Sequence, residues 1–273
     1  MCLIVFAWQS HPDYPLIVAS NRDEFYTRST RPASWWGQAV SVLAGRDEEA
    51  GGTWLGVNRA GRFAMVTNVR SPSDRNPHAP SRGGLVVAAL QAREPVETWM
   101  KQIGPRARTF NGFNLVVGDA LSVGRAKARE ANIHYLSNRR VDPPQRLQAG
   151  IYGLSNAFLD TPWPKVTRAV GRFACQIAQR VDAPSLMRLL ADREIARDHD
   201  LPQTGVPLEW ERVLSSIQIR ANGYGTRTST VLTVRRDGLV TFVERCFDPV
   251  RPDEFTDRQF EFMIDAAVRV PPN

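Results

Sequence analysis

Two apolar runs at the start of the chain constrain the fold more than any other feature. Residues 2–8 read CLIVFAW and are apolar at every position, which is typical of a β-strand buried on both faces. A polar loop that contains a proline, residues 9–14, separates this run from a second apolar run at residues 15–20. The pattern predicts an antiparallel hairpin whose first strand is covered on both sides.

The register of this hairpin determines which side chains lie beside Cys2. Antiparallel pairing across the loop brings the end of the second strand next to the start of the first. We therefore expect Cys2 roughly opposite Asn21, with Arg22 and Asp23 just beyond. The tetrapeptide Asn-Arg-Asp-Glu at residues 21–24 is then a turn after the strand, which is either a solvated turn or part of a site around Cys2.

The rest of the chain alternates between strand and helix patterns. Apolar spacing predicts helices at residues 85–92, 96–103, 163–181 and 184–190. Strand patterns occur at residues 53–57, 62–69, 113–117, 133–136, 150–154, 229–235 and 239–246. No repeat, low-complexity linker or break in composition divides the sequence. Strands at both ends with helices between them indicate one α+β or layered domain, which we assign to residues 1–273.

Cysteine usage and hydropathy bear on the compartment. The three cysteines, Cys2, Cys175 and Cys246, are an odd number at wide spacing, which argues against a disulfide framework and for a reducing compartment. No segment reaches the roughly 18 apolar residues of a membrane span. The apolar run at residues 3–8 is short and has no basic residues before it, unlike a signal peptide. We expect a soluble, cytoplasmic protein.

The net charge of +7 favours anionic partners without indicating a nucleic acid. The basic residues are mostly arginine and are scattered along the chain, with no run of five or six like charges. We therefore expect no nucleic-acid partner.

Cofactor and metal motifs are absent from the sequence. It contains no P-loop, no dinucleotide-binding glycine pattern, no Cys-x-x-Cys and no His-Glu-x-x-His. The four histidines lack the spacing of metal ligands, and each is expected on the surface or in the core: His11, His78, His134 and His199. We expect neither a cofactor nor a metal.

Position 2 gives Cys2 a chemistry that the other cysteines lack. Removal of the initiator Met before a small residue would leave Cys2 with a free α-amine, whose reference pKa of about 7.7–8.0 suits a general base. The thiol, with a reference pKa of about 8.5, is within reach of that amine directly or through one water. One residue would then supply nucleophile and base, as in N-terminal nucleophile enzymes.

Such a site needs a positive group that favours the thiolate, a carboxylate that holds the amine, and donors for an oxyanion. Arg22 and Asp23 could supply the charges, and the amides of Asn68 and Asn156 could supply the donors. The alternative for Cys2 is a small buried hydrophobe at the start of a strand.

Two other conspicuous features have simple structural interpretations. The segment GGTW at residues 51–54 is expected to be a tight turn with a packing tryptophan. Cys175 lies near Phe173 and Ile177 on the predicted helix 163–181 and is expected in the core.

Several blocks occur in order along the chain. They are Met1-Cys2, ASNRDEFY at residues 19–26, GGTWLG at 51–56, NGFNL at 111–115, YGLSN at 152–156 with TPW at 161–163, and GYGTRT at 223–228. Together these blocks resemble the NRDE, or transport-and-Golgi-organisation, family. The resemblance extends from residue 1 to about residue 246, which is nearly the whole chain.

The resemblance implies a fold and a set of site residues. The family is grouped with the N-terminal nucleophile hydrolases, which implies a four-layer αββα sandwich of two stacked antiparallel sheets between helical layers. Within that group, the enzymes of known chemistry that look closest are bile-salt hydrolases and penicillin V acylases. By motif position their catalytic roles carry over to Cys2, Arg22, Asp23, Asn68, Asn156 and Arg227. The adjacency of Arg22 and Asp23 departs from the spacing in those enzymes.

The expected activity is hydrolysis of a non-peptide amide C–N bond in a small or acylated substrate. Cys2 would attack the carbonyl, Asp23 would orient the α-amine, and Arg22 or Arg227 would polarise the site. Asn156 is the first candidate for the oxyanion hole and Asn68 the second.

A non-enzymatic function remains open. Eukaryotic relatives in the family that the chain resembles are associated with Golgi organisation, lipid handling and haem trafficking. The same cleft could therefore hold haem or a lipid, with His78 or Cys2 as an axial ligand of the haem iron.

Overall fold

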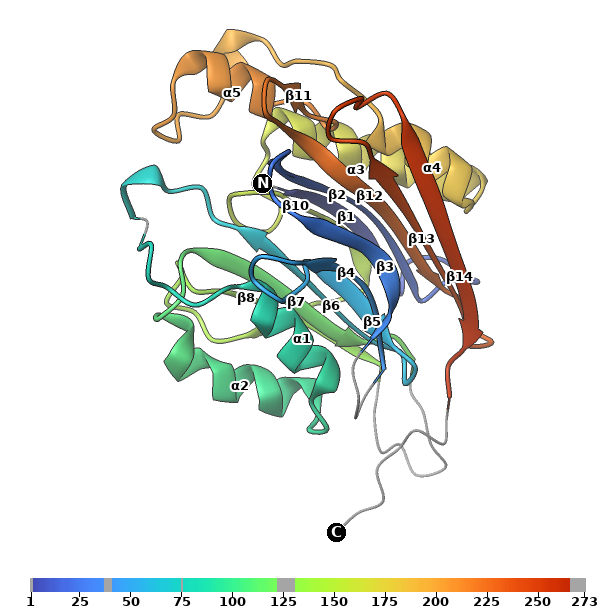
Figure 1. Cartoon of the computed structure of the whole chain (residues 1–273). Coiled ribbons are helices and arrows are strands. Elements are labelled where there is room, and N and C mark those ends of the chain that lie inside the picture. Colours follow the sequence, from blue (N-terminus) through green and yellow to red (C-terminus); the bar gives the residue numbers. More distant parts are fainter. Residues whose placement is uncertain (1, 37–40, 75, 122–130, 266–273) are drawn as a thin grey trace.

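The computed structural model describes residues 2–36, 41–74, 76–121 and 131–265. Two antiparallel β-sheets are stacked face to face, and helices cover the outer face of each sheet (Figure 1). The four-layer αββα sandwich that the family resemblance implies is thereby confirmed.

The first sheet carries the N-terminal strand beside two partners. Its order is β10-β1-β2-β12-β13-β14, and the short β11 pairs with β12. The bounds are β1 (Cys2–Trp8), β2 (Leu16–Phe25), β10 (Gly150–Leu154), β11 (Arg220–Ala221), β12 (Tyr224–Val234), β13 (Leu239–Phe247) and β14 (Phe255–Met263). Since β1 pairs with β2 on one side and with β10 on the other, segments far apart in sequence meet where β1 begins.

The second sheet follows the chain order, β3-β4-β5-β6-β7-β8-β9. Its strands are β3 (Thr30–Trp36), β4 (Val42–Asp47), β5 (Leu55–Asn58), β6 (Arg62–Asn68), β7 (Phe113–Asp119), β8 (Asn132–Ser137) and β9 (Gln145–Arg146). Each neighbouring pair is antiparallel.

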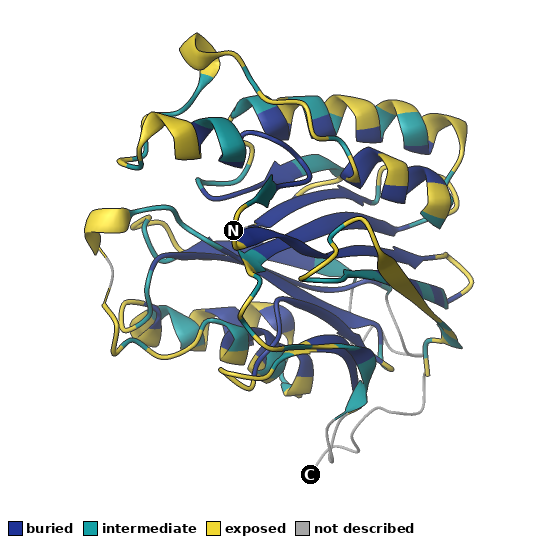
Figure 2. Ribbon diagram, turned by 45° about the horizontal axis from the view of Figure 1, so that its top comes forward, coloured by how far each residue is buried: buried dark blue, intermediate teal, exposed yellow. Residues whose placement is uncertain are grey.

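The N-terminal strand is buried on both faces, as its apolar run predicts (Figure 2). Ile4 and Phe6 belong to the core between the two sheets. Leu3 and Val5 point the other way and pack under the helices α3 (Pro164–Gln179) and α4 (Ala183–Leu190). Because side chains alternate along a strand, β1 contacts the layer on each side of its own sheet: the second sheet on one face and the α3–α4 layer on the other.

Helices α1 (Gly83–Gln91) and α2 (Val96–Ala107) cover the second sheet, while α3 and α4 cover the first (Figure 1). A shorter helix, α5 (Leu208–Leu214), lies near the start of β12, and single 3₁₀ turns occur at Pro72–Asp74 and Asp198–Asp200. The four predicted helices are all present, with ends shifted by a few residues. Within the described ranges, none is long and apolar enough to cross a membrane.

Cys175 is exposed, so its predicted core position is wrong. Phe173 and Ile177 are buried and lie on the inner face of α3. Cys175 is two residues from each of them, which on a helix is about 200° away and therefore on the outer face.

The predicted turn at residues 21–24 is also wrong, because β2 continues through these residues. β12 pairs with β2 on the side away from β1 and supports it as far as Phe25. Cys2 consequently lies opposite Arg22 rather than Asn21, one position from the predicted register.

Candidate functional site

The candidate site lies at the end of the sandwich where β1 begins. Cys2 is the first residue of β1 and pairs with Arg22 on β2. On its other side, the hydroxyl of Ser155, just after β10, donates a hydrogen bond of 2.9 Å to the Cys2 carbonyl. Both neighbouring segments thus hold the backbone of Cys2. The contact with Ser155 was not anticipated, although this residue belongs to the YGLSN motif.

Alternation along β2 divides its polar residues between the two faces of the first sheet. The Asn21 side chain donates to the carbonyls of Leu190 and Ile217 at 2.9 Å each, on the face covered by α3 and α4. Asp23, two residues along, lies on that same face. Arg22 lies on the opposite face, which looks towards the second sheet.

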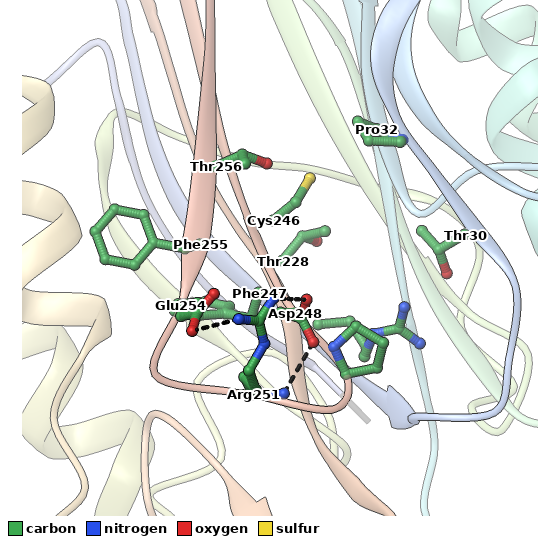
Figure 3. Close-up of a pocket in the computed structure, with 12 residues that line it drawn as sticks. Thr30, Pro32, Thr228, Cys246, Phe247, Asp248, Arg251, Glu254, Phe255 and Thr256 are labelled. Carbon is green, nitrogen blue, oxygen red and sulfur yellow. Dashed lines mark hydrogen bonds and ion pairs between the residues drawn. The ribbon is translucent and has the colours of Figure 1, made fainter.

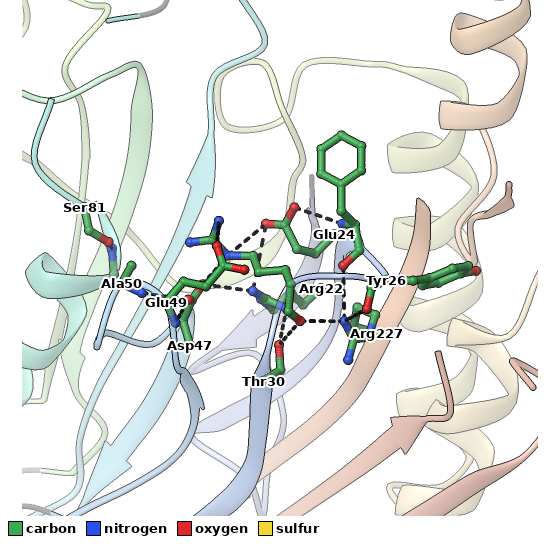
Figure 4. A network of polar contacts seen from close by, with 12 residues as sticks. Arg22, Glu24, Tyr26, Thr30, Asp47, Glu49, Ala50, Ser81 and Arg227 are labelled. Atoms are coloured by element: carbon green, nitrogen blue, oxygen red, sulfur yellow. Dashed lines mark hydrogen bonds and ion pairs between the residues drawn. The ribbon is translucent and has the colours of Figure 1, made fainter. Parts of the chain in front are cut away.

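Arg22 is held by residues of the second sheet (Figure 4). Its guanidinium donates to Asp47 at 3.0 Å and to Thr30 at 3.1 Å, and it lies 4.5 Å from the ring centroid of Trp54. The packing tryptophan of the GGTW segment is therefore a platform for a cation, which is a favourable arrangement for arginine.

Asp47 binds a second arginine that the sequence did not indicate. Arg28 Nε lies 2.7 Å from the same carboxylate oxygen that Arg22 contacts. Burial raises the pKa of Asp47, but the hydrogen bonds from Arg28 and from the Ala50 amide outweigh burial and hold the pKa below its ordinary value. Because Asp47 follows Arg28 by nineteen residues, no local pattern could have identified the pair.

Competing effects act on the thiol of Cys2. Burial raises its pKa, and the nearby Asp23 carboxylate raises it further. The charge of Arg22 and the backbone N–H of Asp23 act in the opposite direction and favour the thiolate. The net pKa is above the ordinary value, so activation of this thiol requires a base.

Asp23 is almost fully buried, with 1% of its surface exposed. Its Oδ1 accepts a hydrogen bond of 2.6 Å from the Thr226 hydroxyl. Burial raises the pKa of Asp23, and Lys165, Thr226 and Arg22 oppose that increase. The sequence patterns do not indicate Lys165, although only Pro164 separates it from the TPW motif.

The two predicted oxyanion donors lie together but differ in their access to open space. Asn156 is buried and donates its side-chain amide to the Asn68 carbonyl at 2.9 Å, while its own carbonyl accepts from the Arg70 amide at 2.7 Å. Asn68 ends β6 and lines the cavity beside Cys2, whereas Asn156 lines neither this cavity nor the adjoining one. Of the two predicted donors, Asn68 is therefore the one that borders the Cys2 cavity.

Two adjoining cavities open beside Cys2. The first, here called the Cys2 cavity, has a volume of about 320 Å³ and is lined by Cys2, Arg22, Asp23 and Asn68 among others. The second, called the Trp210 cavity, has a volume of about 560 Å³. Five residues line both cavities: Glu24, Arg28, Asn68, Arg82 and Asn111. The two cavities therefore form one continuous cleft.

The two halves of the cleft differ in chemistry. Arginine and carboxylate side chains line much of the Cys2 cavity. The Trp210 cavity adds a group of apolar and aromatic residues: Phe25, Val69, Val206, Pro207, Trp210, Leu214 and Tyr224. A ligand with one polar and one apolar end fits this division.

Sequence comparison matches residues 1–249 to the family Transport and Golgi organisation 2. The chain belongs to this family. It is 34% identical to the Transport and Golgi organization protein 2 homolog of Bos taurus, over 97% of this chain and all of that protein. It is 30% identical to the Transport and Golgi organization protein 2 of Drosophila melanogaster, over 92% of this chain and 94% of that one. The match to the family ends before residue 273, so the predicted extent of the domain stays a prediction.

Solved structures with a similar arrangement are distant in sequence. A C2A mutant of the conjugated bile acid hydrolase from Clostridium perfringens has a TM-score of 0.48 at 8% identity, over 96% of this chain and 97% of that one. A Caenorhabditis elegans N-acylethanolamine-hydrolyzing acid amidase ortholog has a TM-score of 0.42 at 12% identity, over 85% and 92%. Neither similarity defines the chemistry of this chain.

Arg227 is not at the Cys2 cavity. The register between β2 and β12 shifts between Thr226 and Thr228, so that Arg227 is the extra residue of a β-bulge. Its guanidinium donates to three carbonyls of the segment after β2, those of Phe25, Tyr26 and Arg28. It lines a separate cavity of about 360 Å³ beside Thr228 and Cys246 (Figure 3). The bulge thus directs the Arg227 side chain to the segment after β2, which it stabilises through these hydrogen bonds.

Within the described ranges, no group of three or more His, Cys, Asp or Glu residues is arranged so that it could hold a metal ion. His134 is buried in β8, and burial lowers its pKa. His78 is exposed and lines neither the Cys2 cavity nor the Trp210 cavity.

Proposed function

We propose that this chain is an N-terminal cysteine nucleophile hydrolase that cleaves a non-peptide amide C–N bond in a small or acylated substrate. The observation that supports this most is that Cys2, Arg22, Asp23 and Asn68 line a single cavity. These residues come from three strands of two different sheets. A buried packing cysteine would not require this set of charged and amide groups around it.

The proposed reaction begins after removal of Met1, which lies outside the described residues. The α-amine of Cys2 takes the thiol proton, and the sulfur attacks the amide carbonyl to form a C–S bond. The Asn68 side-chain amide stabilises the oxyanion. The protonated amine then gives its proton to the leaving nitrogen as the C–N bond breaks, which leaves a thioester on Cys2.

Hydrolysis of the thioester completes the cycle. The α-amine takes a proton from water, the hydroxide attacks the thioester carbonyl, and the C–S bond breaks as the sulfur recovers the proton. Arg22 favours the thiolate in both halves of the reaction, because its guanidinium is fixed on the same face of the sheet as the thiol. The apolar wall of the Trp210 cavity would hold the acyl part of the substrate.

The test combines mass spectrometry with a screen of acyl amides. We expect the intact mass to lack one Met and iodoacetamide to modify Cys2 in a Cys175→Ser background, which removes the exposed thiol. An amide with an apolar acyl group should be hydrolysed, and Cys2→Ala should reduce turnover by at least about 10³-fold. If Met1 is retained, or if Cys2→Ala keeps full turnover of a substrate, the mechanism is wrong.

A second candidate is a protein that binds a lipid in the same cleft without cleaving it. The Trp210 cavity favours this candidate, since it is larger than the Cys2 cavity and carries most of the apolar side chains. Haem binding has less support: of the two predicted axial ligands, His78 is exposed outside both cavities and only Cys2 lines one. A spectral titration with haem and a fluorescent fatty-acid displacement assay, each repeated with Trp210→Ala, separate these functions from hydrolysis.

A further inference from the structure

Lys165 is a buried cation without a hydrogen-bond acceptor. It lies in the first turn of α3, is 1% exposed, and its Nζ has no hydrogen-bond partner among the described residues. Only three of the 35 basic residues of the chain are lysines, the others being Lys101 and Lys127. An ammonium in such a position is costly unless an opposite charge compensates for it.

The face of the sheet under α3 supplies one such charge. Asp23 points to the face that α3 and α4 cover, since Asn21, two residues earlier on β2, bonds to the Leu190 carbonyl at the end of α4. Burial lowers the pKa of Lys165 to about 8, and Asp23 opposes this more than any other group. The other charged or ionisable groups that face Lys165 are Arg70 after β6, Cys2 on β1 and Glu211 on α5.

Glu211 already has partners of its own. It accepts from Arg70 at 2.7 Å and from the backbone and hydroxyl of Thr204 at 2.9 and 2.5 Å. Both side chains of the Arg70–Glu211 pair are only 5% exposed, so this pair is a closed unit. The charges of Arg70 and Glu211 compensate each other, which leaves Asp23 as the oppositely charged partner of Lys165.

We propose that Lys165 is a positioning residue that acts as the buried counter-charge of Asp23. Its ammonium keeps Asp23 ionised on the face of the sheet that α3 covers, so that the carboxylate can orient the α-amine of Cys2. The catalytic consequence rests on the proposed function, but the charge coupling does not. A neutral Asp23 could still accept from Thr226, but it would no longer attract the amine.

The first experiment measures the coupling directly by NMR titration of ¹³Cε-labelled lysine. With three lysines the spectrum is simple, and Lys165→Met assigns the signal of interest. We expect Asp23→Asn to lower the pKa of Lys165 by about one unit or more, because the carboxylate that favours the ammonium is gone. Lys101, which pairs with Glu97 on the surface of α2, is the internal control, and its signal should be the same in both proteins. An unchanged Lys165 titration overturns the proposal.

A double-mutant cycle covers the case in which a single variant folds poorly. Lys165→Met and Asp23→Asn should each destabilise the protein, since each removes an opposite charge from beside a buried ionised group, and the double variant should be more stable than the sum predicts. A double variant that folds where the single variants do not has the same meaning. Strict additivity in urea unfolding contradicts the coupling.

The pH profile separates a positioning role from a purely structural one. With an amide substrate, Lys165→Met should move the acidic limb of kcat/KM upward by about one pH unit, whereas Lys165→Arg, which keeps the charge, should leave that limb in place. If both variants share the wild-type limb, Lys165 has no role through Asp23. If no substrate is turned over, the proposed function fails, and the NMR titration still decides the coupling.

Discussion

Asn68 and Asn156 illustrate how two similar residues in one site take different parts. Asn68 lines the cleft, whereas the side chain of Asn156 is bound to the Asn68 carbonyl. We expect Asn68→Ala to reduce kcat by about 10²–10³-fold with little change in stability, since an oxyanion donor is lost and no buried partner is orphaned. Asn156→Ala leaves a carbonyl without its donor and should also lower the free energy of unfolding by about 1–3 kcal/mol.

Steady-state kinetics and urea unfolding of the same two variants check this assignment. The opposite result, in which Asn156→Ala loses turnover at unchanged stability while Asn68→Ala stays active, would restore the order expected from the motifs. Asn111→Ala is a suitable control, because Asn111 lines the same cleft but bonds to Asn76 at the surface.

At the residue scale, the sequence predicts those members of the site that follow from local pairing. The hairpin alone brings Arg22 and Asp23 to Cys2, because antiparallel register depends on neighbouring segments. Asp47 and Lys165 could not be found in this way. Their contacts depend on how the second sheet and the α3 layer stack on the first, and no periodicity within the chain encodes that stacking.

At the scale of elements, close contact between α1 and the GGTW segment fixes the platform under Arg22. A Cβ on Gly52 would overlap the backbone of Gly83, where α1 begins. We expect Gly52→Ala to push these segments apart and lower the free energy of unfolding by about 1–3 kcal/mol. Trp54 follows by two residues, so the variant should also weaken any activity that depends on Arg22.

Gly84→Ala is the matched control for this contact. Its Cβ would meet nothing within 4 Å, and the residue lies inside α1. Alanine there should raise stability by up to about 1 kcal/mol through its helix propensity. Urea unfolding of both variants is the measurement, and equal effects at the two positions would show that the contact is not tight.

The elements that the sequence predicts are those with an apolar period, and those that it misses lack one. β14 is exposed at most of its positions and lies at the edge of the first sheet, so no buried face leaves an alternating pattern. β3 contains a proline and a register shift at its start, which obscures a strand signal. β2 was predicted too short because its polar end is buried by β12, a partner about two hundred residues away.

At the scale of the whole molecule, the two sheets are connected by a buried carboxyl group. Glu244 on β13 accepts a hydrogen bond of 2.6 Å from the Ala33 amide on β3, and its other oxygen has no partner among the described residues. Burial raises the pKa of Glu244 to about 7, although Ala33, Cys246 and nearby arginines oppose this. The clamp between the sheets is therefore most stable when the carboxyl is protonated.

The sign of the resulting pH dependence follows from proton binding. In the unfolded chain Glu244 loses its proton near the ordinary glutamate pKa of 4.5, whereas in the folded protein it keeps the proton to about 7. Between these values the folded state binds more protons, so the free energy of unfolding falls as the pH rises and is lowest above the folded pKa. The shift corresponds to a loss of about 3 kcal/mol between pH 4.5 and 8.

Glu244→Gln isolates this contribution from the other titrating groups. Glutamine keeps the acceptor for Ala33 and cannot ionise, so the variant should lack the decrease in stability and be more stable than the wild type at pH 8. The buried His134 acts with the opposite sign, because burial lowers its pKa, and it is common to both proteins. The difference between their urea unfolding free energies from pH 5 to 8 therefore reports Glu244 alone. A constant difference across that range would mean that Glu244 is ionised throughout, with Arg22 and Arg258 as compensating charges between the sheets.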